Sequence, residues 1–316
     1  MPPGSEALRR QIARRLLDWG ADLTSDDLIT TCGGTEALML CLRAVTKPGD
    51  VVAVESPTYF CVLQAIEELG LKALEIPMHP RDGMEVEALE RAVATRRIAA
   101  CVAVPNFNNP LGSLMPDDRK QRLLEILTAR GIPLIEDDIY GDLHFGPQRP
   151  RVVQSWDRQG LVMLCGSFSK TLAPGYRVGW VAPGRFYAKV MALKLTSTLA
   201  TGTLPQAAIA EFVANGGYDH CLRAVRQTYA KQVQQMSDAV AASFPSGVKL
   251  TRPSGGFVLW VELPPAVRAL ELQDRAQVEG ISVTPGPMFS ARQGFENFIR
   301  LNCGHPWNAR LELCGK

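Results

Sequence analysis

Short apolar segments alternate with longer segments of helical periodicity from residue 28 to residue 182 of the chain. Most of the short segments are apolar on both faces, which is typical of strands that helices cover on two sides. The seven predicted strands are Leu28–Cys32, Val51–Val54, Ala73–Pro77, Ala100–Val104, Pro133–Glu136, Leu161–Cys165 and Arg177–Ala182. The helices predicted between them are Thr35–Thr46, Tyr59–Leu69, Glu85–Ala94 and Pro116–Arg130. This alternation predicts an α/β fold with a mostly parallel, seven-stranded sheet covered by helices.

Beyond residue 185 the pattern changes to longer helical segments with fewer strands. Two helices are expected within residues 185–215, and Pro205 suits the first turn of the second one. The segments that follow are a long helix over 219–244, a strand hairpin over 248–263, a helix over 266–279 and a strand over 298–303. We therefore expect a large α/β domain over residues 1–215, which includes an N-terminal helix, and a smaller C-terminal α+β domain over residues 216–316.

The composition is that of an ordinary soluble globular protein. Hydrophobic residues make up 46% and charged residues 21%, which excludes a disordered chain. The net charge of +2 gives no electrostatic reason to expect nucleic acid or a membrane surface as a partner. No apolar run approaches the roughly 20 residues of a spanning helix, and the N-terminal segment lacks the apolar core of a secretory signal. A cytoplasmic location is the resulting expectation.

The cysteines and histidines indicate no metal site. None of the eight cysteines forms a C-x-x-C pair, most of them lie in apolar segments, and the four histidines are scattered. Such cysteines are expected to be reduced and buried rather than joined in disulfides or bound to zinc.

Polar and glycine-containing segments follow five of the predicted strands. They are Gly33–Glu36, Pro57–Tyr59, Asn106–Gly112, Glu136–Tyr140 and Gly166–Lys170. Each segment alone is compatible with an ordinary turn or helix cap. The carboxyl ends of parallel strands share one edge of a sheet, however, and ligands of open α/β folds bind there. The joint placement of these segments, with Arg177 close behind the last, therefore predicts one ligand site.

The same segments resemble fold-type I pyridoxal 5'-phosphate (PLP) enzymes, the aspartate-aminotransferase superfamily. The resemblance covers about residues 5–305 and is specific when its motifs are taken together. Ser167–Arg177 resembles the family's Schiff-base lysine segment, Asn109–Gly112 its N-P-x-G turn, and Asp137–Tyr140 its D-x-x-Y segment. The resemblance implies PLP as the cofactor and a homodimer as the assembly.

The resemblance also implies catalytic roles for Lys170, Asp137 and Tyr140. The Lys170 amine would form a Schiff base with the cofactor aldehyde and then move a proton as base and acid. The Asp137 carboxylate would keep the pyridine nitrogen protonated by charge pairing. Asp138 should point to the other side of its strand, so that only one of the two neighbouring carboxylates faces the ring.

The remaining cofactor contacts follow from the same resemblance. Asn109 and Tyr140 would donate hydrogen bonds to the ring oxygen, and Tyr59 would stack on the ring. The phosphate would be held by backbone amides at a helix N-terminus, by two hydroxyls and by a guanidinium, which assigns Gly34, Thr35, Glu36, Ser167, Ser169 and Arg177. Glu36 would contribute only its backbone N–H, because a carboxylate beside a phosphate is unfavourable.

The substrate is expected to be an amino acid and its 2-oxo acid. Arg300 matches the family arginine that binds the substrate carboxylate, with Asn109 beside it in the substrate site. The expected reaction is transamination, the transfer of an amino group between an amino acid and a 2-oxo acid through Lys170. Decarboxylation, racemisation and β-elimination use the same cofactor and stay open.

There are two alternatives to a stand-alone aminotransferase: another enzyme class that shares one of the motifs, and a regulatory role for the same domain. Ser167–Lys170 also fits the S-x-x-K motif of penicillin-binding proteins, but the accompanying S-D-N and K-T-G motifs are absent. Residues 179–226 and 252–264 look most like the aminotransferase-like domain of bacterial MocR-type regulators of the GntR group. There the domain follows a DNA-binding winged helix and senses PLP or an effector, so nucleic acid is a partner only if such a module precedes this chain.

The chain ends carry three further expectations. Residues 9–15, with their four arginines, are expected to form a solvated helix face rather than a DNA-reading element. The family's N-terminal arm, with a tyrosine that reaches the neighbouring subunit's phosphate, has no counterpart before Met1. The family's helix after the arginine strand has only the 16 residues after Arg300 to match it.

Overall fold

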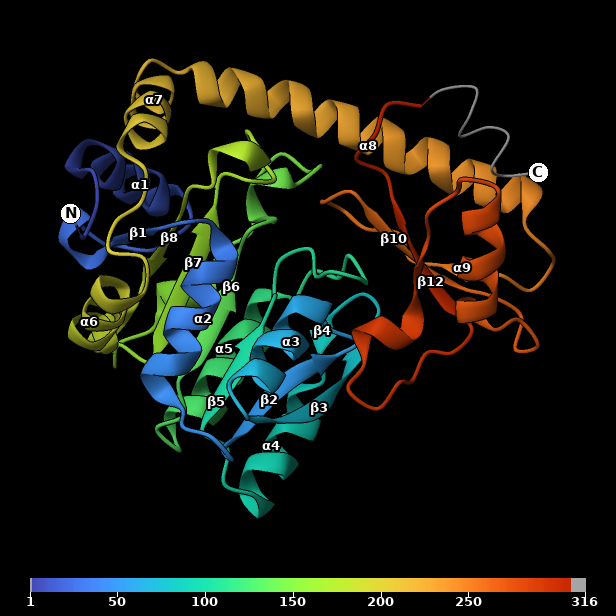
Figure 1. Ribbon diagram of the computed structural model, residues 1–316, viewed down its shortest axis with the longest axis horizontal. Coiled ribbons are helices and arrows are strands. Elements are labelled where there is room, and N and C mark those ends of the chain that lie inside the picture. The colour runs from blue at the N-terminus through green and yellow to red at the C-terminus, as the bar shows by residue number, and fades with distance from the viewer. Residues whose placement is uncertain (1, 308–316) are drawn as a thin grey trace.

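The computed structural model describes residues 2–307, which form a large mixed sheet and a smaller antiparallel sheet (Figure 1). The large sheet has the order β1-β8-β7-β6-β5-β2-β3-β4. Its strands are β1 (Ile29–Thr31), β2 (Val51–Ser56), β3 (Lys72–His79), β4 (Gly83–Met84), β5 (Ala100–Ala103), β6 (Leu134–Asp137), β7 (Val162–Ser167) and β8 (Gly179–Ala182). Neighbours from β3 through β2, β5 and β6 to β7 are parallel, whereas β4, β8 and β1 join antiparallel. All seven predicted strands are present, and the two-residue β4 adds an eighth.

The helices cover both faces of this sheet because its strands are apolar on both sides. One face packs against α2 (Gly34–Val45), α3 (Phe60–Glu68) and α6 (Tyr187–Ser197). The other packs against α4 (Val86–Thr95) and α5 (Asp117–Thr128) and, further along, against α1 (Glu6–Asp18) and α7 (Thr203–Ala214). Pro205 lies in the first turn of α7, as predicted.

The expectation of a fully solvated basic face on the N-terminal helix is wrong for Arg9 and Arg15. Arg10 and Arg14 are exposed, but Arg9 is buried and Arg15 is largely buried. Helix α1 is pressed between α7 and the sheet, where Leu8, Ile12 and Leu16 enter the core. Two of its arginines therefore turn inward and find protein acceptors.

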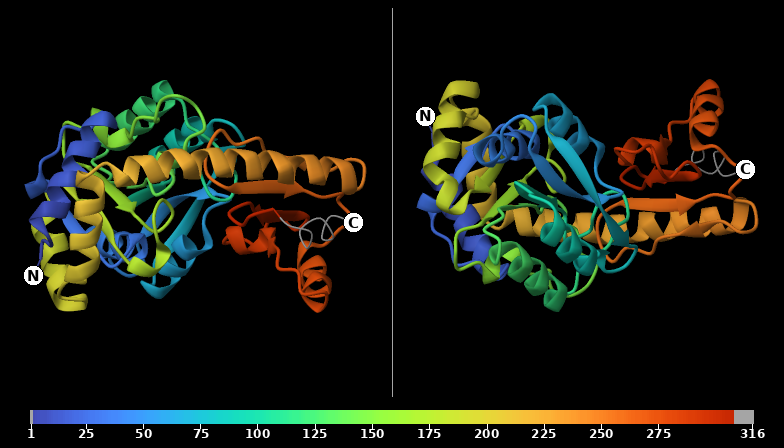
Figure 2. Two further views of the ribbon diagram at one scale, coloured as in Figure 1. Left: turned by 90° about the horizontal axis from the view of Figure 1, so that it is seen from above. Right: turned by 90° about the horizontal axis from the view of Figure 1, so that it is seen from below.

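The C-terminal part is built on the small sheet, with strand order β11-β12-β10-β9, all antiparallel. Helix α8 (Gly217–Ser243) runs from the large sheet to the small one (Figure 2). The remaining elements are β9 (Lys249–Leu250), β10 (Val258–Glu262), α9 (Ala269–Val278), β11 (Thr284–Pro285) and β12 (Phe298–Asn302). The predicted long helix, hairpin, second helix and last strand are all present. The domain division between residues 215 and 216 stays a prediction.

Short 3-10 helices occupy several loops: η1 (Ser25–Asp27), η2 (Gly141–Leu143), η3 (Val153–Trp156), η4 (Pro174–Tyr176), η5 (Gly184–Phe186) and η6 (Gly286–Phe289). The seven cysteines within residues 2–307 are free, whereas Cys314 and the rest of the C-terminal segment lie outside the described residues. None of the helices in the described range is long and apolar enough to cross a membrane.

Candidate active site

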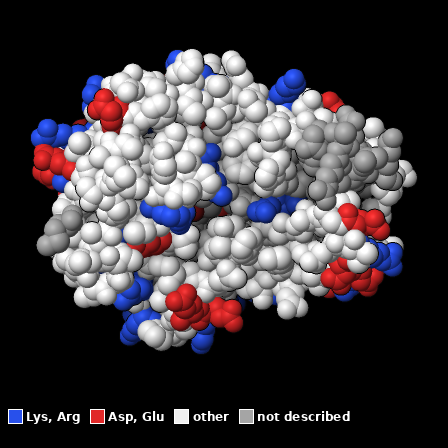
Figure 3. Space-filling model, turned by 45° about the horizontal axis from the view of Figure 1, so that its top comes forward, with Lys and Arg blue, Asp and Glu red and all other residues white. Residues whose placement is uncertain are grey.

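The predicted site residues gather where the strands of the large sheet end. Asp137 is the last residue of β6, Lys170 follows β7, and Asn109 lies in the loop after β5. Arg300 arrives from β12 of the small sheet, so both sheets contribute side chains. One face of the molecule is hollowed at its middle, and Lys and Arg side chains lie around this hollow (Figure 3).

The residues predicted to bind phosphate form one connected cluster. The Arg177 guanidinium donates to Ser169 Oγ at 3.3 Å and to the Cys32 carbonyl at 3.1 Å, and Ser167 Oγ lies 3.0 Å from Ser169 Oγ. Helix α2 begins beside this cluster, and no side chain of the described residues caps its N-terminus. Its first N–H groups, the hydroxyls and the guanidinium together suit a dianion.

Gly33 makes the close approach of Arg177 to this helix start possible. Its φ of 92° lies in the region that favours glycine, and a Cβ there would stand 2.4 Å from Arg177 Nη2. Arg177 itself has φ of 50°, at the end of η4. The backbone is thus bent at two points to bring the guanidinium beside the start of α2.

The Glu36 carboxylate is held by a partner that no local pattern indicated. It accepts hydrogen bonds from the Cys32 N–H at 2.6 Å and from the buried Lys194 amine of α6 at 2.7 Å. Burial acts to raise its pKa, but the hydrogen bonds from Lys194, Thr198 and Cys32 prevail and lower the pKa. Glu36 is therefore paired with Lys194 rather than with Arg177.

Asp137 and Asp138 face opposite sides of the sheet. Asp137 continues the side of Ile135, which packs with α2, whereas Asp138 lies on the side of Leu134. Asp137 Oδ1 is buried and has no hydrogen-bond partner among residues 2–307. Burial, followed by the charge of Asp138, raises the pKa of Asp137 to about 7. The Ile139 backbone N–H and the Lys170 charge act in the opposite direction. A buried carboxylate oxygen without a hydrogen bond is costly, and a protonated ring nitrogen is the kind of partner that would satisfy it.

The Lys170 amine lies in the same electrostatic environment. It makes no hydrogen bond to any described residue, and burial together with the charges of Arg300 and Arg177 lowers its pKa, against the opposing effect of Asp137. A lowered pKa increases the share of neutral amine, which is the nucleophilic form. Lys170 is therefore close enough to Asp137 and Arg177 for both charges to act on its pKa, and the roles predicted for these three residues stay predictions.

Asn109, Tyr140 and Arg300 form a second connected group. The Asn109 amide donates to the Tyr140 hydroxyl at 3.3 Å, and Arg300 donates to Asn109 Oδ1 at 3.2 Å. Arg300 Nη2 also donates to Thr284 Oγ1 at 3.1 Å, while its Nε is buried without a partner among the described residues. Tyr59 lies within reach of the Arg300 charge. Burial raises the pKa of Tyr59, and the Arg300 charge opposes this rise.

Glu55 was not predicted as a functional residue, and Asn108 only as part of the segment Asn106–Gly112, but the two residues together shape the turn that carries Asn109. Glu55 Oε2 accepts from the Asn108 amide at 2.6 Å and from the Val104 N–H at 3.1 Å, and Asn108 Oδ1 accepts from the Leu111 N–H at 3.2 Å. Burial raises the pKa of Glu55 to about 8. A carboxylate within the apolar strand β2 was the signal that could have identified this pair.

The fold and this arrangement define a class of protein. A mostly parallel sheet, a lysine amine near a buried carboxylate, and an anion-binding cluster at a helix N-terminus are the features of fold-type I PLP-dependent enzymes. The chain belongs to the aminotransferase class I and II family, whose sequence model matches residues 1–316.

Relatives of two kinds resemble the chain. The uncharacterized HTH-type transcriptional regulator YjiR of Escherichia coli (strain K12) is 44% identical over 96% of this chain, which spans 64% of that relative. Aromatic-amino-acid aminotransferase 1 of Thermococcus litoralis is 33% identical over 87% of this chain, which spans 67% of that relative. The chain thus covers about two thirds of the length of these relatives.

A solved structure shares the fold. The α-aminoadipate aminotransferase LysN of Thermus thermophilus, crystallised with N-(5'-phosphopyridoxyl)-L-leucine, superposes with a TM-score of 0.89 at 32% identity, covering 96% of this chain and 77% of that one. The phosphopyridoxyl group is bound in that structure, and the chain shares its fold and its family. The unpaired Asp137 oxygen and the Ser167–Arg177 cluster suit the two ends of such a group.

Proposed function

We propose that the chain is a PLP-dependent aminotransferase-type protein that transfers an amino group between an amino acid and a 2-oxo acid. The observation that carries the proposal is that the Lys170 amine, which makes no hydrogen bond to a described residue, lies within the electrostatic influence of Asp137 and Arg177. One oxygen of Asp137 is buried without a hydrogen bond among the described residues. These three groups match the aldehyde, the ring nitrogen and the phosphate of PLP.

The cofactor would be held at both ends by the groups described above. Its phosphate would be bound by Ser167, Ser169, Arg177 and the first N–H groups of α2, at Gly34, Thr35 and Glu36. Asp137 would pair with the ring nitrogen, Asn109 and Tyr140 would donate to the ring oxygen, and Tyr59 would stack on the ring. When bound, PLP supplies an electron-accepting ring that stabilises negative charge at the substrate Cα.

The chain's own groups would then bind and orient the substrate and move its proton. Arg300 would bind the substrate carboxylate, because its guanidinium is fixed by Asn109 and Thr284 and still has an unpaired Nε. Lys170, with its lowered pKa, would take and return the Cα proton. A homodimer in the cytoplasm is the proposed setting, since proteins of this family are generally dimeric.

A second candidate function is a PLP- or effector-sensing domain of a MocR-type regulator with little or no turnover. The 44% identity to a transcriptional regulator favours it, because this is the higher of the two identities reported above. The cofactor site would be the same in both cases. Contact with nucleic acid would belong to a module outside this chain.

Two measurements test these functions. Purified protein mixed with PLP should show a visible absorbance band, which Lys170→Ala abolishes and the exposed-lysine variant Lys189→Ala retains. A band that survives Lys170→Ala would refute the lysine assignment. Addition of an amino-acid panel then separates the two functions: rapid conversion to the pyridoxamine spectrum supports the transaminase, and an unchanged spectrum supports the sensor.

A further inference from the structure

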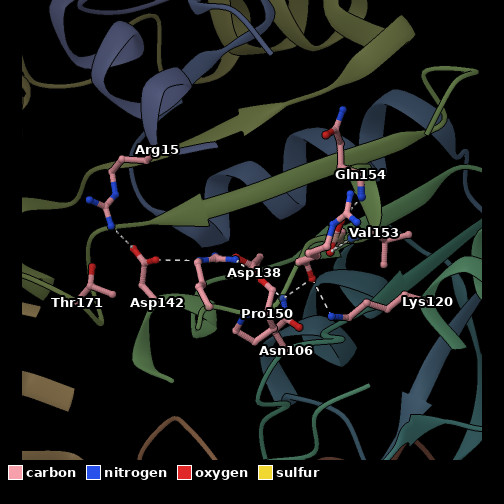
Figure 4. Close-up of polar contacts among 12 residues, drawn as sticks. Arg15, Asn106, Lys120, Asp138, Asp142, Pro150, Val153, Gln154 and Thr171 are labelled. Atoms are coloured by element: carbon pink, nitrogen blue, oxygen red, sulfur yellow. Dashed lines mark hydrogen bonds and ion pairs between the residues drawn. The ribbon is translucent and has the colours of Figure 1, made fainter. Parts of the chain in front are cut away.

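A chain of buried charges extends from Arg15 through Asp142 to Asp138 (Figure 4). It lies on the face of β6 opposite Asp137, because side chains alternate along the strand. Asp138 accepts hydrogen bonds from Arg149 and, at 2.7 Å, from Asn106. Arg149 Nε also donates to Asp142 Oδ1 at 2.8 Å, and Arg15 of α1 reaches Asp142 Oδ2 at 3.2 Å. The side chains of Arg149, Asp138 and Asp142 are at most 8% exposed, so water screens these charges little.

Arg149 is held on every side. Its Nη1 donates to the Pro150 carbonyl at 2.8 Å, and its guanidinium lies 3.6 Å from the centroid of the Trp19 ring at the end of α1. A planar guanidinium that pairs with two carboxylates while stacked on an indole has no equivalent in lysine. Lysine could therefore not replace arginine at this position without losing some of these contacts.

The Asp138 carboxylate affects Asp137 because the two residues are consecutive. After burial, the Asp138 charge is the largest influence that raises the pKa of Asp137. Burial raises the pKa of Asp138 itself, and the Arg149 charge is the largest influence that opposes this rise. Removal of Arg149 would leave two adjacent carboxylates in a region of low dielectric, where like charges cannot both stay ionised at little cost.

We propose that Arg149 is a positioning residue which, by neutralising Asp138 on one face of β6, keeps Asp137 charged and directed at the cofactor ring nitrogen on the other face. The inference rests on the proposed function, since it needs PLP in the site. According to this proposal, Arg149 increases the affinity for PLP without touching the cofactor.

Helix α1 belongs to the same arrangement. Trp19 covers Arg149, and Arg15 neutralises Asp142, which would otherwise compete with Asp138 for Arg149. Arg15 also lies 4.6 Å from the centroid of the Tyr218 ring, whose hydroxyl donates to Thr171 Oγ1 at 2.7 Å, next to Lys170 in the chain. The N-terminal helix thus contacts the supports of both Asp137 and Lys170.

Other titratable groups also lie beside this chain of charges. Asp142 also faces Arg226 and Tyr218 of α8, while Glu136 and the Lys120 amine of α5 lie further along the same face of the sheet. Arg149 is the one residue of the described chain that joins Asp138 to Asp142 by hydrogen bonds. Its removal therefore changes the charge next to Asp137 more directly than any of these.

The test compares PLP dissociation constants, measured by absorbance, for four proteins. Arg149→Met should raise the dissociation constant by about tenfold or more, the factor that one unit of pKa represents. Because Asp137 would then ionise at a higher pH, the pH-dependent change in the absorbance band of bound PLP should also move to a higher pH. The double variant Arg149→Met/Asp138→Asn should return the constant to within about twofold of the parent. Arg158→Met, at an exposed arginine, should leave it unchanged.

The double variant separates a charge effect from a packing effect. If both variants fold and the double variant binds PLP no better than Arg149→Met, Arg149 is merely structural and the proposal fails. Unchanged binding by Arg149→Met overturns it as well. If Arg149→Met does not fold, Asp138→Asn alone decides: retained or tighter PLP binding supports the proposal, and binding weakened by about tenfold overturns it. A parent protein that binds no PLP refutes the proposed function instead.

Discussion

Asp137 and Asp138 are consecutive in the chain, but their carboxylates have opposite surroundings. Asp138 is paired with Arg149 and Asn106, whereas one oxygen of Asp137 is buried without a hydrogen bond among the described residues. Strand alternation places them on the two faces of β6. One face therefore carries a satisfied charge network, and the other presents an unsatisfied carboxylate to the candidate cofactor site.

Replacing Asp137 should have opposite effects on folding and on cofactor binding. Asp137→Asn removes a buried charge, one oxygen of which has no hydrogen bond among the described residues, so the unfolding free energy without PLP at about pH 8 should rise by about 1–3 kcal/mol. The same change removes the charge pairing with the ring nitrogen, so PLP affinity should fall about 10- to 100-fold.

Denaturant unfolding without PLP and absorbance titration with PLP measure the two effects. Asp157→Asn is a suitable control, because Asp157 is a partly exposed carboxylate that accepts backbone hydrogen bonds away from the site. A variant that loses stability while it keeps PLP affinity would contradict the assignment.

Gly33→Ala should weaken anion binding, because the added Cβ would stand 2.4 Å from Arg177 Nη2. The residue's positive φ adds a backbone cost of about 1–2 kcal/mol for any L side chain. Gly131→Ala is the matched control, since Gly131 also has positive φ but a Cβ there meets nothing within 4 Å. Both variants should melt earlier. Only Gly33→Ala should weaken binding of PLP and of inorganic phosphate, and equal binding by the two variants would argue against the cluster.

Arg300→Lys should weaken binding of 2-oxo acids and leave PLP binding nearly unchanged. A bidentate guanidinium that faces a carboxylate is worth more than a single ammonium, so the dissociation constant should rise about 10- to 100-fold. Titration of the PLP-loaded protein with a panel of 2-oxo acids gives the comparison. Arg268→Lys serves as the control, because Arg268 is exposed and pairs with Glu296 at 2.6 Å. An equal loss in both variants would exclude Arg300 as the carboxylate ligand.

The stability of the protein without PLP should fall as the pH rises from about 5 to about 8, in part because of Glu55. Burial raises the pKa of this carboxyl from 4.5 to about 8, so the folded state binds its proton more tightly than the unfolded state. Its contribution is fully present below pH 4.5 and is lost as the pH approaches about 8. One such group changes the unfolding free energy by at most about 1.4 kcal/mol per pH unit.

Glu55→Gln should flatten this dependence, because the amide keeps the acceptor for Asn108 but does not titrate. Glu68→Gln, at an exposed carboxyl of α3, should leave the slope as it is. Unfolding free energies measured by denaturant at several pH values provide the test. An unaltered slope in Glu55→Gln would mean that the Glu55 carboxyl is already ionised in the folded protein at the acidic end of this range.

The sequence predicted the elements that local patterns encode. Strands apolar on both faces, helices of regular period and the segments at strand ends lie where expected, as does Pro205 in the first turn of α7. The expectation of a solvated arginine face failed for Arg15 because its acidic partners, Asp142 and Asp219, lie far along the chain. It failed for Arg9 because this side chain is buried beside the Ser25 carbonyl. Charge partners that are distant in sequence leave no periodic signal.

Local patterns were enough to predict the order of the candidate site residues along the chain: a lysine after β7, an aspartate at the end of β6, an Asn-Pro turn after β5 and a glycine pair at the start of α2. Alternation, turn residues and motif spacing are properties of neighbouring residues. Three pairings required the folded chain: Lys194 with Glu36, Glu55 with Asn108, and Arg149 with Asp138 beneath α1. These pairs form because burial makes an unpaired charge costly, so each buried group is matched with whichever partner the fold brings near it.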